Sequence, residues 1–161
     1  GLRLHNRFLE SLDSPPERVL FEVYAGRYKA SFDIPALIPQ VYLHYDPYTR
    51  RERGLEQVLA RQRMDFLMLP ANGVRIVIEI DGQHHYGNAG RDGEYKTSAS
   101  KYAAMVAEDR RLSLSGYEVY RFGAAEFHQP ENSDDVAPAI GAKVVDFFAA
   151  LFRRHGLTPT R

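Results

Sequence analysis

The sequence predicts an α/β or α+β protein in which a central mixed β-sheet is flanked by helices. Two apolar runs, residues 64–69 and 74–80, are separated by Pro70-Ala71-Asn72-Gly73. An Asn-Gly pair between such runs is a strong hairpin signal. Helical patterns precede this hairpin, and a helix, a strand and a second helix follow it. This element order indicates a sheet with helices packed against it.

The other elements follow from local patterns. Apolar residues at helical spacing predict a helix over residues 2–12. Ser14-Pro15-Pro16-Glu17 is a capping box with proline at the first helical position, and it predicts a helix from Pro15 to about Tyr24. Residues 31–49 are rich in proline and aromatics, which favours extended structure with a short strand near residues 41–45.

The second half of the chain alternates loops with regular elements. Glycine, asparagine and serine in residues 87–98 indicate a loop, and a polar loop is expected over residues 129–135. The expected elements here are a helix over 99–115 with Tyr102, Met105, Val106 and Leu112 facing inward, a strand over 117–122 and a helix over 136–154.

Composition limits the class of protein. The chain has 161 residues, of which 44% are hydrophobic and 26% charged, and this suits a single globular domain over residues 1–161. The absence of cysteine excludes disulfides and thiolate metal sites and favours a cytoplasmic location. No signal-peptide pattern and no apolar run of about 18 residues is present, so we expect no membrane association. Because the first residue is Gly1, we also expect a domain cut from a longer protein.

Charge is balanced, with 21 basic and 21 acidic residues. This balance argues against a protein that wraps nucleic acid by bulk charge. Arginines gather before the hairpin, at residues 50–63, and they predict either a local basic patch or an ordinary solvated face.

Three acids lie within the apolar hairpin: Asp65, Glu79 and Asp81. A buried carboxylate is costly unless it is paired or binds a metal. Pairing across the turn places Asp65 opposite Glu79 or its neighbour, and alternation places Glu79 and Asp81 on one face. With Asp65 facing Glu79, all three lie within reach of one ion, and oxygen ligands favour Mg²⁺ or Mn²⁺. The alternative is a structural salt-bridge cluster.

A divalent cation at such a site suits phosphodiester hydrolysis, because it polarises the phosphoryl oxygen and activates a bound water. The strand acid, the Glu-x-acid on the next strand and the helix behind them resemble the PD-(D/E)XK, or restriction-endonuclease-like, nuclease superfamily. The ordered pieces Asp65-Phe66, Glu79-Ile80-Asp81-Gly82, His84-His85, Asp109-Arg110, Gly116-Tyr117 and Arg121-Phe122 are similar to those of very-short-patch-repair-like nucleases. The segments "ALIPQVYLHYDP", "RQRMDFL" and "IEIDGQHHY" resemble the nuclease-like N-terminal domain of AbiJ-type abortive-infection proteins. The likeness covers roughly residues 30–127.

This resemblance implies a restriction-endonuclease-like core in which Asp65 and Glu79 are metal carboxylates and the Ile80 carbonyl is a further ligand. Asp81 stands where the superfamily pattern has lysine, and this departure puts the usual cationic helper in doubt. Lys101, on the following helix, is a candidate replacement, and the alternative is a solvated lysine.

The remaining candidates each have a simpler structural explanation. Glu17, with Glu22 in reserve, matches the helix-one acid of such sites, yet Glu17 also completes the capping box. Asp109 and Arg110 form an ion pair in the simplest interpretation, with substrate contact as the alternative. The candidates for nucleic-acid contact are Arg61, Arg63, His84 and His85, of which one histidine could shuttle a proton and the other is a surface residue.

Three classes of function remain open. The favoured class is a Mg²⁺- or Mn²⁺-dependent endonuclease that serves as the effector domain of an antiphage, abortive-infection protein. The second is an inactive nuclease-fold domain that binds nucleic acid or a partner protein, and the third is a structural interaction domain, against which the three acids count. The expected partners are nucleic acid, with DNA favoured over RNA, further domains of the full-length protein and a second copy in a homodimer.

Overall fold

Four strands form one mixed sheet in this structure, which is a computed structural model. It describes residues 2–42, 63–83, 87–89, 95–128 and 136–159. The strands lie in the order β1-β2-β3-β6, with bounds of Leu37–Tyr42, Arg63–Met68, Arg75–Asp81 and Tyr117–Gly123. Strand β2 pairs antiparallel with β1 and with β3, whereas β6 runs parallel to β3. The predicted mixed sheet with flanking helices is therefore confirmed.

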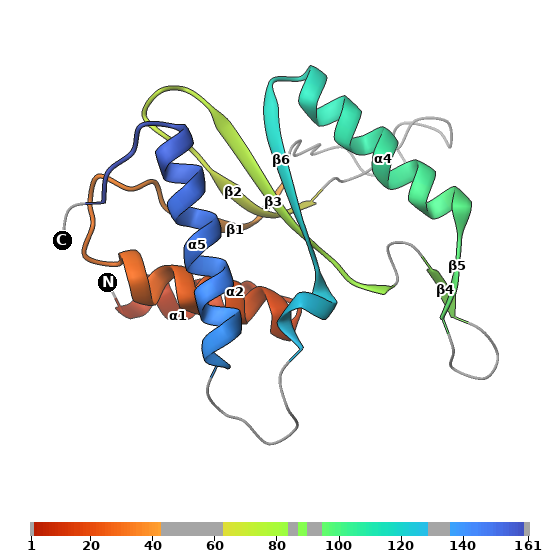
Figure 1. Cartoon of the computed structure of the whole chain (residues 1–161), viewed down its shortest axis with the longest axis horizontal. Coiled ribbons are helices and arrows are strands. Elements are labelled where there is room, and N and C mark those ends of the chain that lie inside the picture. The colour runs from red at the N-terminus through yellow and green to blue at the C-terminus, as the bar shows by residue number, and fades with distance from the viewer. Residues whose placement is uncertain (1, 43–62, 84–86, 90–94, 129–135, 160–161) are drawn as a thin grey trace, which may run out of the picture.

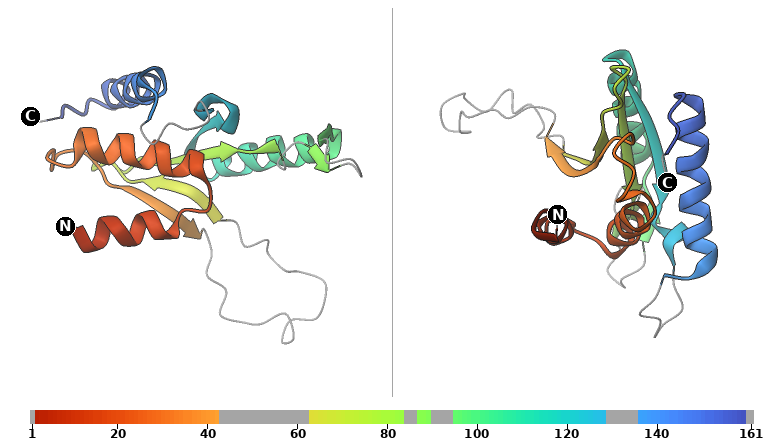
Figure 2. Two further views of the ribbon diagram at one scale, coloured as in Figure 1. Left: turned by 90° about the horizontal axis from the view of Figure 1, so that it is seen from below. Right: turned by 90° about the vertical axis from the view of Figure 1, so that its left-hand side faces the viewer.

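Within these described residues, four helices and one 3-10 turn accompany the sheet: α1 (Leu2–Ser11), α2 (Pro15–Tyr28), α4 (Ala99–Leu114), η1 (Ala124–Phe127) and α5 (Pro138–Arg154). Helices α4 and α5 lie on either side of β6 (Figure 1). Helix α2 lies between α1 and α5 in both views of Figure 2. No helix within the described residues is long and apolar enough to cross a membrane.

The two faces of β3 contribute to different cores. Ile76, Ile78 and Ile80 join a large apolar cluster with residues of α2 and α5. Val77 packs instead with Met64 and with Leu112 of α4 in a smaller cluster. Because side chains alternate along a strand, Glu79 and Asp81 project from the face that carries Val77, toward α4.

Helix α2 begins where the capping box predicts. Ser14 is the N-cap residue, and its hydroxyl accepts a hydrogen bond from the Glu17 backbone N–H at 3.4 Å. The helix ends at Tyr28, beyond the predicted end near Tyr24. Both tyrosines pack against aromatic side chains of α5, and the ring centroids of Tyr24 and Phe148 are 4.6 Å apart. This tertiary packing extends the helix past its local signals.

The β2–β3 hairpin also follows its prediction. The Gly73 N–H donates to the Pro70 carbonyl at 3.1 Å, and Gly73 has a φ of 79°. This left-handed conformation favours glycine, which explains the Asn-Gly signal.

Two local predictions were wrong, and a third was correct in part. The strand expected near residues 41–45 is present but begins earlier, at Leu37, and residues 43–45 lie outside the described part of the chain. The segment expected to be a loop over 87–98 contains two short strands, β4 (Gly87–Ala89) and β5 (Tyr95–Thr97), which pair antiparallel. Their glycine-rich composition conceals the pairing. Tyr102 is 58% exposed rather than inward-facing, whereas Leu112 is fully buried as predicted.

Candidate functional site

Hairpin register brings Asp65 and Glu79 together. The pairing of β2 with β3 runs from Met68–Ile76 to Phe66–Ile78, and the same register continued by one step would set Asp65 opposite Glu79. This is the register that the three-acid hypothesis required. Asp65 Oδ2 accepts a hydrogen bond from the Ile80 backbone N–H at 2.8 Å, so the Asp65 side chain binds the peptide that follows Glu79.

Both carboxyl groups are held in a poorly solvated environment. Burial raises the pKa of Asp65 to about 6, the Ile80 hydrogen bond opposes this rise, and the neighbouring Glu17 charge adds to it. Burial raises the pKa of Glu79 to about 8, with a further contribution from the Asp65 charge and an opposing one from Arg121. No salt bridge joins either carboxylate to another described residue. The two acids therefore form a pair that resists full ionisation near neutral pH.

Asp81 lies close to this pair but has its own cation. Arg121 Nη1 is 2.7 Å from Asp81 Oδ1, and Arg121 Nη2 is 2.7 Å from Asp109 Oδ1 on α4. The parallel register of β3 and β6 places Arg121 directly beside Glu79. Arg121 therefore bridges two carboxylates and lies next to a third.

Arg121 belongs to the pieces of the motif likeness, but it was not predicted to be a site residue. The ion pair predicted between Asp109 and Arg110 is wrong, because Asp109 pairs with Arg121 and Arg110 is exposed. Arg121 alternates with Val119 and Tyr117 along β6, so a parallel pairing with β3, had it been assumed, would have placed it on the acid face.

The expected three-acid cation centre is not found. No group of three or more histidine, aspartate or glutamate side chains within the described residues is arranged to hold a metal ion. The ion pair with Arg121 accounts for this difference, because it engages the Asp81 carboxylate. Of the three hairpin acids, Asp65 and Glu79 form no salt bridge with another described residue, and we call these two residues the acid pair.

Glu17 borders the acid pair and also serves the helix cap. Its carboxylate accepts hydrogen bonds from the Ser14 hydroxyl at 2.7 Å and from the Asp13 backbone N–H at 3.1 Å. The negative charge of Glu17 nevertheless contributes to the raised pKa of Asp65. Glu17 therefore supports the helix cap as predicted, although through the Ser14 hydroxyl and the Asp13 N–H rather than through the Ser14 N–H of a complete capping box, and it is at the same time a neighbour of the acid pair. Glu22, the reserve candidate, is exposed on α2.

Two further basic candidates have other contacts. Lys101 Nζ donates to the Gly87 carbonyl at 2.7 Å, which ties the start of α4 to β4. Arg63 lies near enough to influence Asp65 but forms a salt bridge with Asp13. Arg61, His84 and His85 lie outside the described residues.

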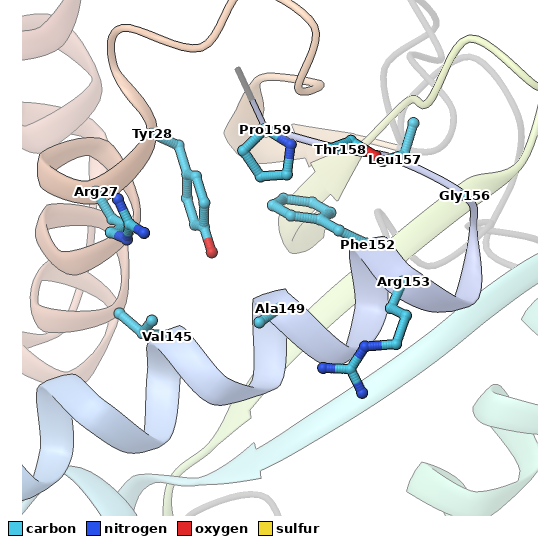
Figure 3. A pocket seen from close by; sticks show the side chains of 10 residues that line it. All are labelled: Arg27, Tyr28, Val145, Ala149, Phe152, Arg153, Gly156, Leu157, Thr158 and Pro159. Atoms are coloured by element: carbon cyan, nitrogen blue, oxygen red, sulfur yellow. The ribbon is translucent and has the colours of Figure 1, made fainter. Parts of the chain in front are cut away.

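The molecule also has a cavity that is separate from the acid pair. It measures about 450 Å³ and lies between the end of α2, helix α5 and the segment that follows α5 (Figure 3). Arg27 and Arg153 border it, and no acidic residue and no predicted site residue lines it. The acid pair therefore lies outside this cavity.

Comparison with known proteins gives no relative: the chain matches no protein-family model, no curated protein and no solved structure. What the structure defines is an α+β protein whose four-stranded mixed sheet is flanked by helices and carries the acid pair, in which Glu79 is buried and Asp65 is partly buried.

Proposed function

We propose that this chain is a divalent-cation-dependent nuclease with a restriction-endonuclease-like core whose reaction centre is the acid pair, Asp65 and Glu79. The observation that carries the proposal is the placement of two shielded carboxylates on neighbouring strands, without a salt bridge to any described residue. Their raised pKa values express the free energy of holding like charges together away from water. A cation would relieve this repulsion.

The donor set fits Mg²⁺ or Mn²⁺. Mg²⁺ keeps several waters and is commonly bound through one or two carboxylates together with substrate phosphates, so a third acid is not required. Asp65 and Glu79 would hold the ion, and the Ile80 carbonyl, a further candidate ligand, belongs to the residue whose backbone N–H donates to Asp65 Oδ2. The bound ion would polarise a phosphoryl oxygen and lower the pKa of a water.

The chain's own residues supply the remaining requirements. Glu79, with a pKa of about 8, can carry a proton near neutral pH and release it when a cation binds. Arg121 adds positive charge beside Glu79 and fixes Asp81 through their ion pair. In this proposal Asp81 shapes the site indirectly, and Lys101 braces the start of α4.

The biological setting is an extension of the same proposal. The motif likeness to abortive-infection proteins supports an effector role in antiphage defence, with nucleic acid as substrate and DNA favoured over RNA. Balanced overall charge supports substrate capture by further domains or by a homodimer, because bulk electrostatic attraction to phosphates is weak.

One observation favours the second candidate, a nuclease-fold domain that binds nucleic acid or a protein without cleaving. Asp81 occupies the position of the superfamily lysine, and Arg121 neutralises it. A site that lacks the usual lysine can retain the fold and lose the chemistry.

Cleavage assays distinguish the two candidates. Plasmid DNA and RNA are incubated with Mg²⁺ or Mn²⁺ and the wild-type chain, Asp65→Asn or Glu79→Gln. We expect wild-type cleavage, with each variant reduced at least about 100-fold because it loses a cation ligand. Glu10→Gln, at an exposed position of α1, is the matched control and should cleave as wild type does. Cleavage that survives in both site variants would disprove the proposed centre.

A further inference from the structure

Gln40 in β1 has an unusual backbone conformation at the position that faces the acid pair. Pro39 pairs with Phe66 and Val41 pairs with Met64, which leaves Gln40 opposite Asp65 without a ladder pairing. Its φ is 55°, and no other described residue except glycine has a positive φ. Residues other than glycine rarely adopt this backbone conformation, and residues that do so cluster at functional sites.

Glu17 fixes the orientation of the Gln40 amide. Gln40 Nε2 donates to Glu17 Oε2 at 2.7 Å. A carboxylate only accepts hydrogen bonds, so the NH₂ group must face Glu17 and the amide oxygen must point elsewhere. Glu17 is itself held by Ser14 and the Asp13 N–H, so the amide has a rigid support.

The amide oxygen of Gln40 is buried and has no partner. It is the one buried side-chain oxygen or nitrogen in the described part of the chain for which no hydrogen bond is found. A buried acceptor without a partner is costly, and natural proteins rarely keep one without a reason. Gln40 therefore combines a strained backbone, an oriented amide and an unsatisfied oxygen, and the β1–β2 register sets this residue opposite Asp65.

We propose that the Gln40 amide oxygen supplies a neutral oxygen to the hydrated divalent cation of the acid pair. Amide oxygens are common ligands of hard cations and of their bound waters, and a neutral oxygen adds no further repulsion to Asp65 and Glu79. This inference rests on the proposed cation-dependent function. It assigns Glu17 the role of a positioning residue that acts through Gln40.

The test measures cation binding rather than cleavage. Mn²⁺ alone is titrated by calorimetry near pH 8 into the wild-type chain, Asp65→Asn, Gln40→Met and Gln40→Asn. Gln40→Met keeps the length of the side chain but removes the oxygen. Gln40→Asn suits a positive φ and withdraws the amide by one methylene, so it remains informative if the methionine variant does not fold. Gln83→Met, at an exposed glutamine after β3, is the control.

We expect wild-type binding that Asp65→Asn abolishes. Both Gln40 variants should bind Mn²⁺ at least about tenfold more weakly than wild type, because removing an outer ligand of a metal site generally lowers its affinity by this amount. The metal-free variants should still melt cooperatively. Gln83→Met should bind as wild type does. Wild-type affinity in both Gln40 variants would overturn the role of Gln40 and leave the proposed function intact. No Mn²⁺ binding by the wild-type chain would overturn both.

Discussion

Glu79 shows at the scale of one residue how a site and fold stability conflict. It lies in a strand of buried residues and is itself only 8% exposed. Burial raises its pKa to about 8, and the Asp65 charge contributes to the rise. At pH values where Glu79 must ionise, its charge is therefore unfavourable in the folded state, where it is shielded from water. The same charge is hydrated in the unfolded chain and carries no such cost.

The sign of the pH dependence follows from this shift. The pKa of Glu79 is higher in the folded state than its ordinary value of 4.5, so the folded protein binds more protons across this range. The free energy of unfolding should therefore be unaffected by Glu79 below about pH 4 and should fall as pH rises toward about pH 8. Glu79→Gln should raise the free energy of unfolding near pH 8 by about 1–3 kcal/mol and change it little near pH 4.

Urea denaturation of both proteins at the two pH values measures this difference, with Glu22→Gln as an exposed control. If wild type and Glu79→Gln lose stability equally with rising pH, then ionisation of Glu79 is not the cause of that loss.

At the scale of elements, the turn between α4 and β6 determines which residues reach the acid pair. Arg75, at the start of β3, donates to the Ser115 carbonyl at 2.6 Å and stacks over the Tyr117 ring at 4.3 Å. These contacts accompany the pairing of Arg75 with Tyr117. Four residues further along both strands, the same parallel register places Arg121 beside Glu79.

Gly116 is the residue that makes this turn possible. Its φ is 82°, and a Cβ atom added there would lie 2.9 Å from Arg75 Nη2. We expect Gly116→Ala to lower the free energy of unfolding by about 1–2 kcal/mol, because it strains the backbone and displaces Arg75.

Gly26→Ala is the matched comparison, since Gly26 lies within α2 and an added Cβ would contact nothing within 4 Å. It should raise stability by up to about 1 kcal/mol through helix propensity. Chemical denaturation of both variants measures the contrast, and equal effects would contradict the role assigned to the turn.

At the scale of the molecule, helices α5 and α4 bury very different amounts of apolar surface. Helix α5 buries five apolar residues against the sheet: Ile140, Val144, Phe148, Leu151 and Phe152. Helix α4 has 16 residues, and Leu112 is its one buried residue. The salt bridge between Asp109 and Arg121 therefore contributes an unusually large share of the attachment of α4.

Hydrogen exchange should reveal this inequality. We expect the amides of α4 to exchange faster than those of α5, because local opening is easiest where little apolar surface is buried. Arg121→Gln should accelerate exchange in α4 further and leave α5 unchanged, since it leaves Asp81 and Asp109 without their shared cation.

Lys143→Gln, which removes an exposed salt bridge to Glu126, serves as the control and should leave α4 unchanged. Uniform acceleration across both helices in Arg121→Gln would instead indicate global destabilisation.

The sequence by itself determined the elements whose signals are local. The capping box fixed the start of α2, and Asn72-Gly73 fixed the hairpin and hence the approach of Asp65 to Glu79. These features were predictable because caps, tight turns and strand alternation depend on residues close together in the chain. The short β4–β5 pair was not predictable, since its glycine-rich sequence carries no strand signal.

Only the tertiary structure decided how distant segments meet at the acid pair. The parallel pairing of β3 with β6 brought Arg121 to Asp81, and the pairing of β1 with β2 set Gln40 opposite Asp65. Such pairings join residues separated by tens of positions, and they form because the two sides of the sheet must bury their apolar faces together. The sequence therefore identified the two acids, Asp65 and Glu79. Long-range packing determined that Arg121, Glu17 and Gln40 lie around them.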